Sequence, residues 1–342
     1  MKIYANNNNI LGLPDGLVTH YIDHTIVPDD CDLIVTTFYN NYYQKNLEII
    51  HALQTKTKKL AVMLFEPTEQ KPGDLDKFLK CLGSNVQVFG CAELNWDCAN
   101  YQNAIAWFVD GMHNYYAETA WAQDLIAQLE FNYDKPKKFD CLLGKARSHR
   151  NIVAKLYDSS TVKNDVFFSY FQNSVSNGIW YNLQSESNNA ELTTHRVLFR
   201  NASVCMSTLL PVEIYNQTYY SIVAETVCSN AYSQFTEKTA KPIIARRPFV
   251  VFAGQYYLQN LRKLGFKTFD GVIDESYDLV PDMQQRMTDA WRQVESLCQQ
   301  DPKSVYKKLQ PILDHNYDVF TNTNWLQNIH DFVSGATSRN RT

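Results

Sequence analysis

The chain has 342 residues and a formal net charge of −4, with 45% hydrophobic and 20% charged residues. This length suits two domains with separate cores, and the composition excludes a disordered chain. The slight acidity excludes binding of nucleic acid or membranes through a polybasic tail, but it leaves room for a local basic cleft.

The eight cysteines form no CxxC pair, and several lie within apolar runs. We interpret them as reduced, buried residues of a protein in a reducing compartment. The opening residues MKIYANNNNI lack the apolar core of a signal peptide, and no apolar run reaches the roughly 18–20 residues of a membrane span. These features predict a cytoplasmic protein without a membrane span.

The first part of the chain alternates apolar runs of strand length with polar segments of helical spacing. Expected strands cover the amino terminus and residues 32–40, 58–66 and 85–94, and expected helices cover residues 43–54 and 118–130. This alternation is typical of a largely parallel sheet covered by helices on both sides.

The polar segment FNYDKPKK (131–138) predicts a domain boundary, because few core contacts can cross it. We therefore expect an amino-terminal domain over 1–134 and a carboxy-terminal domain over 135–342. Gly265 is expected just past a helix end, and the residues after 282 form a helical tail. The predicted fold class is α/β, with two Rossmann-like domains facing a cleft. In the second domain we expect strands at 137–144, 166–171, 195–201, 219–226 and 248–254, and helices at 148–159, 235–247 and 255–265.

Ligands of open parallel sheets bind beyond the carboxyl ends of the strands, and a basic segment, GKARSHR, is expected at such an end. Gly144 permits a turn, Ser148 is a candidate N-cap of the next helix, and Lys145, Arg147 and Arg150 add positive charge. The turn, the helix start and the cations together favour a bound anion such as phosphate. The alternative is a solvated basic turn that happens to start a helix.

A second charged segment, TEKTAKP, follows another predicted strand. Thr236 can cap a helix, which places Glu237 in its first turn. Lys238 and Lys241 share a helical face, and Pro242 keeps the element short or kinked. A carboxylate beside two ammonium groups suits a nucleoside diphosphate, since lysines neutralise phosphates and the carboxylate accepts from ribose hydroxyls. An ordinary salt-bridged helix face is the alternative.

Glu225 ends the apolar strand that precedes this segment. Two carboxylates, Glu225 and Glu237, at one sheet edge could hold a sugar or a ribose. A strand-end carboxylate that faces water is the alternative.

FTEKTAKPIIARRPFVVFAG, followed by LRKLGFKTFDGVIDESYD, resembles nucleotide-sugar glycosyltransferases of the two-domain GT-B architecture. These enzymes are found in bacteria and tailed phages and are distantly related to fucosyltransferases and exostosin-like enzymes. The resemblance covers residues 138–290 and implies that Glu237 contacts the donor ribose and Lys238 the diphosphate. It also implies that Arg147 and Arg150 hold the pyrophosphate. Lys241-Pro242 departs from the fucosyltransferase pattern, so the resemblance defines neither the donor base nor the sugar.

An inverting GT-B enzyme needs a general base, and Glu66, at the end of a predicted strand, is our choice over Asp23, Glu93 and Asp110. IDESYD (273–278) could bind Mg²⁺ or Mn²⁺ through hard oxygens, but we interpret it as a helix-capping turn, and we expect no metal or other cofactor. We discount two further candidates, the D-x-D triplet at 30–32, which precedes its strand, and the His20/His24 pair, which lacks a third ligand.

The sequence thus predicts a metal-independent glycosyltransferase that moves a sugar from a nucleoside diphosphate to a hydroxyl. The acceptor is a surface glycan or a hydroxylated base in phage DNA, which a groove containing Lys56, Lys58 and Lys59 could contact. The alternatives are a non-catalytic nucleotide-binding or structural phage protein on the same fold and, more remotely, a phosphosugar epimerase. The expected donor-binding residues are Gly144, Lys145, Arg147, Arg150, Glu225, Thr236, Glu237, Lys238 and Lys241.

Overall fold

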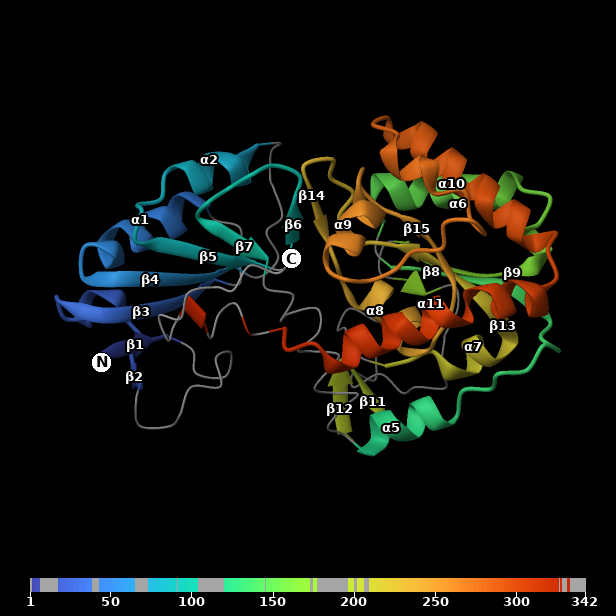
Figure 1. The fold of residues 1–342 in the computed structure, drawn as a ribbon, viewed down its shortest axis with the longest axis horizontal. Coiled ribbons are helices and arrows are strands. Elements are labelled where there is room, and N and C mark those ends of the chain that lie inside the picture. Colours follow the sequence, from blue (N-terminus) through green and yellow to red (C-terminus); the bar gives the residue numbers. More distant parts are fainter. Residues whose placement is uncertain are drawn as a thin grey trace. The chain divides into compact units, whose positions relative to one another are not determined.

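The computed structural model divides the chain into two compact units (Figure 1). Unit 1 comprises residues 1–107 and 324–342, and unit 2 comprises residues 108–323. The structure describes residues 2–6, 18–38, 43–64, 73–90, 92–103, 120–144, 146–172, 175–176, 196–199, 202–205, 209–325, 327 and 331–332.

Unit 1 is built on a parallel sheet of strand order β2-β1-β3-β4-β5-β7. The central strands β3 and β4 are almost wholly buried, as their continuous apolar sequences predict. Helices α1 and α2 contact each other and lie on one face of the sheet (Figure 1). The elements are β1 (Ile3–Ala5), β2 (Val18–His20), η1 (His24–Ile26), β3 (Cys31–Phe38), α1 (Tyr43–Gln54), β4 (Thr57–Leu64), α2 (Asp74–Lys80), β5 (Val86–Gly90), β6 (Ala92–Leu94) and β7 (Tyr101–Asn103).

Unit 2 contains a second sheet of order β10-β9-β8-β13-β15, parallel except for the short edge strand β10. Its elements are α5 (Ala120–Ala127), β8 (Lys137–Leu143), α6 (Ser148–Ser159), η3 (Lys163–Asp165), β9 (Val166–Gln172), β10 (Val175–Ser176), β11 (Arg196–Phe199), β12 (Ala202–Cys205), α7 (Val212–Gln217), β13 (Thr218–Ala224), β14 (Tyr232–Gln234), α8 (Glu237–Ile244), β15 (Phe249–Phe252), α9 (Tyr257–Lys263), η5 (Glu275–Leu279), α10 (Met283–Cys298) and α11 (Pro302–Asn322).

The chain order of this second sheet reverses between β8 and β13. From β8 the chain runs through α6 to β9 on one side, whereas from β13 it runs through α8 to β15 on the other. Right-handed crossovers in opposite directions place their helices on opposite faces of a sheet. Accordingly, α6 packs with α10 on one face, and α8 packs with α11 on the other (Figure 1).

The predicted domain limits, 1–134 and 135–342, differ from the limits of the two units. Helix α5 belongs to unit 2, where Asn216 of α7 donates to the Gln128 carbonyl (2.9 Å) and accepts from the Glu130 amide (2.9 Å). At the other end, the chain returns to unit 1, where the Phe332 ring packs against Phe89. The polar segment 131–138 lies within unit 2. Polar composition does not report these long-range contacts.

The expected helical tail is an integral part of unit 2 as far as residue 323. Trp291 of α10 is 3% exposed and contacts the Phe252 ring of β15, and Phe320 of α11 is 1% exposed. The helix pattern was therefore predicted correctly, but its packing was not. Likewise, the expected strand at 195–201 is β11, which pairs with β12 in a separate antiparallel hairpin.

Smaller sequence predictions are also resolved. Gly265 follows the end of α9 with a φ of 93°, as expected for a residue at C′. The six cysteines whose side chains the structure describes are free, as predicted; Cys31, Cys141 and Cys298 are buried, whereas Cys81 is exposed. Among the described residues, no helix is long and apolar enough to cross a membrane.

Candidate functional site

The carboxyl ends of β8 and β13 form the point at which the strand order of unit 2 reverses. Such switch points leave a crevice beyond the strand ends, because the flanking loops and helices diverge to opposite faces. Helix α6 begins shortly after β8, and Glu225 directly follows β13. The fold thereby brings together the two segments, GKARSHR and TEKTAKP, that are about 90 residues apart in the sequence.

Glu225 organises this edge from beneath. Its side chain is fully buried, and its carboxylate accepts hydrogen bonds from the backbone amides of Thr226 and Thr236 (both 3.2 Å). It also accepts from the hydroxyls of Thr236 (2.5 Å), Thr239 (2.7 Å) and Tyr257 (2.8 Å). The interpretation of a strand-end carboxylate facing water is therefore wrong. Both oxygens are engaged by protein donors, so Glu225 fixes the loop and the start of α8.

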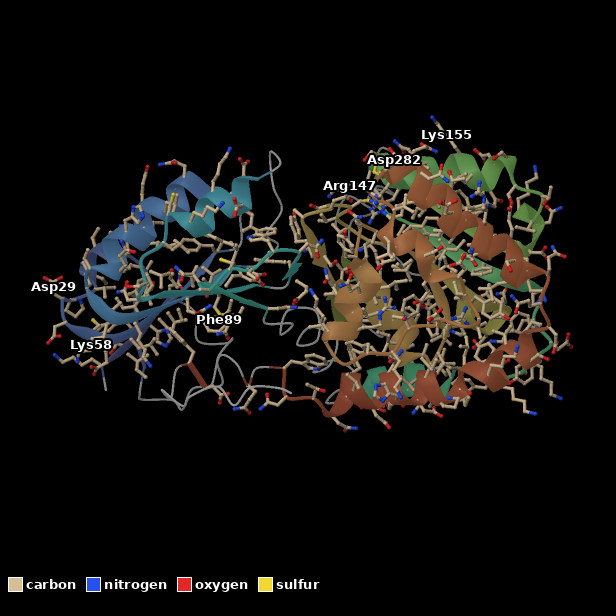
Figure 2. The ribbon with its side chains drawn as sticks, turned by 45° about the horizontal axis from the view of Figure 1, so that its top comes forward. Asp29, Lys58, Phe89, Arg147, Lys155 and Asp282 are labelled. Carbon is tan, nitrogen blue, oxygen red and sulfur yellow. The ribbon has the colours of Figure 1, made fainter. Side chains whose placement is uncertain are left out.

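Helix α6 begins one residue away from the expected cap. Ser148 is the first helical residue, and Arg147 occupies the N-cap position with extended backbone and no capping hydrogen bond from its side chain. The prediction of Ser148 as the N-cap was wrong by this one residue. Since the first amides of a helix have no partner within the helix, this uncapped start suits an anion. Arg147 is exposed at the surface of unit 2 (Figure 2).

Two side chains from the first turn of α6 reach the end of β13. His149 Nε2 donates to the Glu225 carbonyl oxygen (2.8 Å), and Arg150 Nη2 donates to the same oxygen (2.9 Å) and to that of Ala224 (3.2 Å). Burial, reinforced by the charges of Arg150 and Arg147, lowers the pKa of His149 to about 4, so this imidazole is neutral at pH 7. An added Cβ at Gly144 would lie 3.3 Å from the Arg150 guanidinium, so glycine leaves room for that group.

Helix α8 begins as predicted. The Thr236 hydroxyl accepts from the Lys238 amide as the N-cap, and the helix spans only the eight residues Glu237–Ile244, with Pro242 inside. Lys238 Nζ forms an ion pair with Glu237 and donates to the Thr226 hydroxyl (3.1 Å). Burial opposes ionisation of Glu237, but the positive charges of Lys238 and Lys241 outweigh it and lower the pKa of Glu237 to about 2.

The charges at this edge are predominantly positive. Arg150 interacts electrostatically with Arg147, Glu225 and Glu237, and Glu237 interacts with Lys238 and Lys241. Four cations therefore accompany two carboxylates, an excess that matches the charge of a diphosphate. Lys241 is 8% exposed, so it contributes mainly through its field, whereas the partly exposed Lys238 side chain can contact a ligand directly.

Two predicted residues, Lys145 and Glu66, lie outside the described part of the chain. Among the other candidates for the base, Glu93 accepts from the Asn103 amide (2.9 Å), and Asp23 caps the short helix η1. Asp110 also lies outside the described residues. The structure thus leaves the general base a prediction.

The acidic segment IDESYD has the capping role that we expected. Asp274 caps η5, and the Asp278 carboxylate accepts from the Leu258 (3.0 Å) and Gln259 (3.1 Å) amides at the start of α9. Glu275 is buried and forms an ion pair with Arg262 (2.9 Å). Within the described residues, no group of three or more His, Cys, Asp or Glu side chains could hold a metal ion.

Sequence reasoning missed three residues of this edge: His149, Thr239 and Tyr257. Each is buried and acts through a hydrogen bond to Glu225, which lies between 14 and 76 positions away in the chain. One signal for these residues was present in the sequence, namely that His149 lies between Arg147 and Arg150, the two predicted anion-binding arginines. The chain matches no protein-family model, and comparison with curated proteins finds no significant match.

Proposed function

We propose that this protein is a GT-B-type glycosyltransferase whose unit 2 binds a nucleoside-diphosphate sugar. The observation that carries the proposal is the cationic edge at the β8/β13 switch point, where two helices begin and the cations outnumber the carboxylates. A diphosphate needs this combination of helix-start amides and cationic side chains.

Each residue then has a distinct task. Arg147 and Lys238 contact the phosphates, and the amides at the start of α6 add neutral donors. Glu237 remains ionised and accepts from the ribose hydroxyls. Arg150 and Lys241 supply positive charge from buried positions, while Glu225 holds α8 in place. Stabilising the charge that develops on the departing diphosphate lowers the barrier to sugar transfer.

This edge of the sheet says less about the chemical identity of the acceptor than about that of the donor. We propose a hydroxyl group on a glycan or on a hydroxylated base in phage DNA, with Glu66 as the base that removes its proton. Binding of a DNA acceptor should weaken steeply with salt because phosphate contacts release counterions, whereas binding of a neutral glycan should not.

The first test is a thermal-shift screen of the full chain against UDP-, GDP-, CMP- and dTDP-sugars. A ligand at 100 times its dissociation constant adds about 2.7 kcal/mol of stability, which corresponds to roughly 5–11 °C in Tm for a unit of this size. Arg147→Ala and Lys238→Ala should each abolish most of the shift. Lys155→Ala, an exposed position further along the same helix α6, should not.

Product analysis separates the alternatives. A glycosyltransferase should release nucleoside diphosphate with an acceptor, and slowly without one. A non-catalytic protein would bind the sugar nucleotide and leave it intact, and an epimerase would convert it to another sugar nucleotide. The absence of a stabilising ligand from all four donor classes would refute the proposal.

A further inference from the structure

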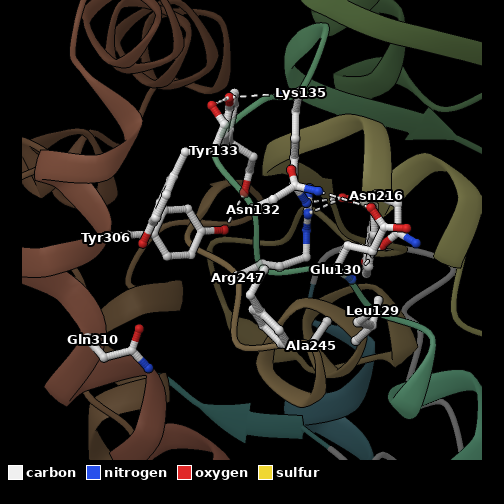
Figure 3. Close-up of a pocket in the computed structure, with 13 residues that line it drawn as sticks. Leu129, Glu130, Asn132, Tyr133, Lys135, Asn216, Ala245, Arg247, Tyr306 and Gln310 are labelled. Carbon is white, nitrogen blue, oxygen red and sulfur yellow. Dashed lines mark hydrogen bonds between the residues drawn. The ribbon is translucent and has the colours of Figure 1, made fainter.

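A pocket at the opposite edge of the unit 2 sheet has no role in the proposed reaction. It lies beside the residues that precede β8, β13 and β15, and these parallel strands all begin at the edge away from the crevice. The hollow is open to solvent, and its volume of about 460 Å³ includes that open space, so a ligand would lie across its mouth and not within an enclosed cavity. Tyr306 and Gln310 of α11 form one side, and Leu129, Glu130 and Asn216 form the other (Figure 3).

Aromatic rings dominate the mouth of this pocket. Phe131 is 63% exposed and Tyr133 is 48% exposed, although large apolar side chains usually pack away from water. The Tyr133 ring meets the Tyr306 ring edge to face, with centroids 6.0 Å apart. The Tyr219 hydroxyl donates to the Tyr133 carbonyl (2.5 Å) and accepts from the Lys135 amide (2.9 Å), so the exposed rings are carried by an anchored backbone.

Beside the rings lie polar groups that can form further hydrogen bonds. Lys135 donates one of the three N–H bonds of its ammonium group to the Tyr215 carbonyl (2.8 Å), and within the described chain no second acceptor takes the others. Glu130 accepts through one carboxylate oxygen from Asn132 (3.0 Å), and Gln310 donates to Asp314 (3.0 Å). The second Glu130 oxygen and the side-chain oxygens of Asn132 and Gln310 can still accept.

The charges in the pocket nearly cancel. Arg247, which forms the floor, is paired with Asp140 (3.0 Å), and its remaining N–H groups donate to Ser221, Thr218 and nearby carbonyls. The Lys135 charge faces Glu130, and burial together with the Arg247 charge lowers the pKa of Lys135 to about 8. A strongly charged ligand therefore gains little here.

From this geometry we infer that the pocket is a second binding site, which holds a neutral saccharide unit. Sugar hydroxyls both donate and accept, so they match a site that offers an ammonium donor and several acceptor oxygens side by side. The apolar face of a sugar ring packs on exposed aromatic faces such as those of Phe131 and Tyr133. This inference does not depend on the proposed donor site, because the two sites lie at opposite ends of the same strands.

Saturation-transfer NMR on the full chain tests the site, with glucose, galactose, mannose, N-acetylglucosamine, maltose and lactose as probes. We expect at least one sugar to give a signal that Tyr133→Ala reduces at least fivefold. Leu279→Ala removes another exposed apolar side chain outside the pocket and should leave the signal unchanged. Lys238→Ala should leave it unchanged as well, which separates this site from the donor crevice.

A second measurement on the wild-type chain covers the case in which Tyr133→Ala fails to fold. Acetylation of Lys135 by N-hydroxysuccinimidyl acetate at pH 8, followed by mass spectrometry, should slow at least threefold in the presence of the bound sugar. The exposed Lys303 should be acetylated at an unchanged rate. No signal from any of the six sugars, a signal that survives Tyr133→Ala, or unprotected Lys135 would each overturn the inference.

Discussion

Replacing Glu225 with glutamine keeps the shape of the side chain but removes the charge that organises the edge of the unit 2 sheet at the β8/β13 switch point. Each carboxylate oxygen of Glu225 accepts from one backbone amide, Thr236 on one side and Thr226 on the other. Whichever way the glutamine amide turns, its NH₂ group therefore faces a partly buried N–H donor. A backbone N–H can only donate, so neither amide can form a hydrogen bond with the NH₂ group.

The expected cost follows from these contacts. A buried donor left without an acceptor costs about 1–3 kcal/mol, and hydrogen bonds to a charged acceptor contribute about 1.5–3 kcal/mol each. Some of the hydroxyl donors, such as Thr239 and Tyr257, can reorient toward the glutamine and recover part of this loss. We expect Glu225→Gln to lower the free energy of unfolding of unit 2 by about 3 kcal/mol, which is roughly 6–12 °C in Tm.

Differential scanning calorimetry of the full chain, with urea unfolding monitored by fluorescence, measures this change. Glu213→Gln is the matched control, since Glu213 is an exposed carboxylate on α7 and its replacement should alter stability by less than about 0.5 kcal/mol. A loss below about 1 kcal/mol in Glu225→Gln would show that the charge of Glu225 does not hold this edge together.

Three further substitutions test other parts of unit 2. The pKa of His149 is lowered in the folded protein, so this residue should add stability that is complete above about pH 6.5 and is lost as the pH falls toward 4. His149→Gln should make the free energy of unfolding less dependent on pH over that window. NMR titration should place the imidazole pKa near 4. Asp140→Asn should cost about 3–5 kcal/mol in urea unfolding, because the buried Arg247 loses its ion-pair partner. Gly254→Ala should lower the free energy of unfolding by at least about 1–3 kcal/mol, measured from the change in Tm. The added Cβ would lie 1.7 Å from the Ser229 carbonyl oxygen, so the backbone must move. An unchanged Tm would contradict that close approach.

Much of the local structure was predictable from the sequence. Continuous apolar runs marked β3, β4 and β13, since a strand buried on both faces needs apolar side chains throughout. Capping chemistry placed the start of α8 at Thr236 and the end of α9 before Gly265, because backbone groups at helix ends need specific partners or a positive φ. The charged residues and helix-start signals of GKARSHR and TEKTAKP also predicted an anion site at the strand ends that the fold brings together.

Local patterns alone determined which segments are strands and helices and which of them carry charge, because those properties depend on residues within a few positions of each other. Only the tertiary structure decided that Glu225 is buried beneath α8, that His149 and Arg150 contact the end of β13, and that α10 and α11 cover the sheet. These outcomes depend on strand order, which sets the neighbours of each side chain. Strand order arises from the packing of distant segments, and a single sequence does not display it.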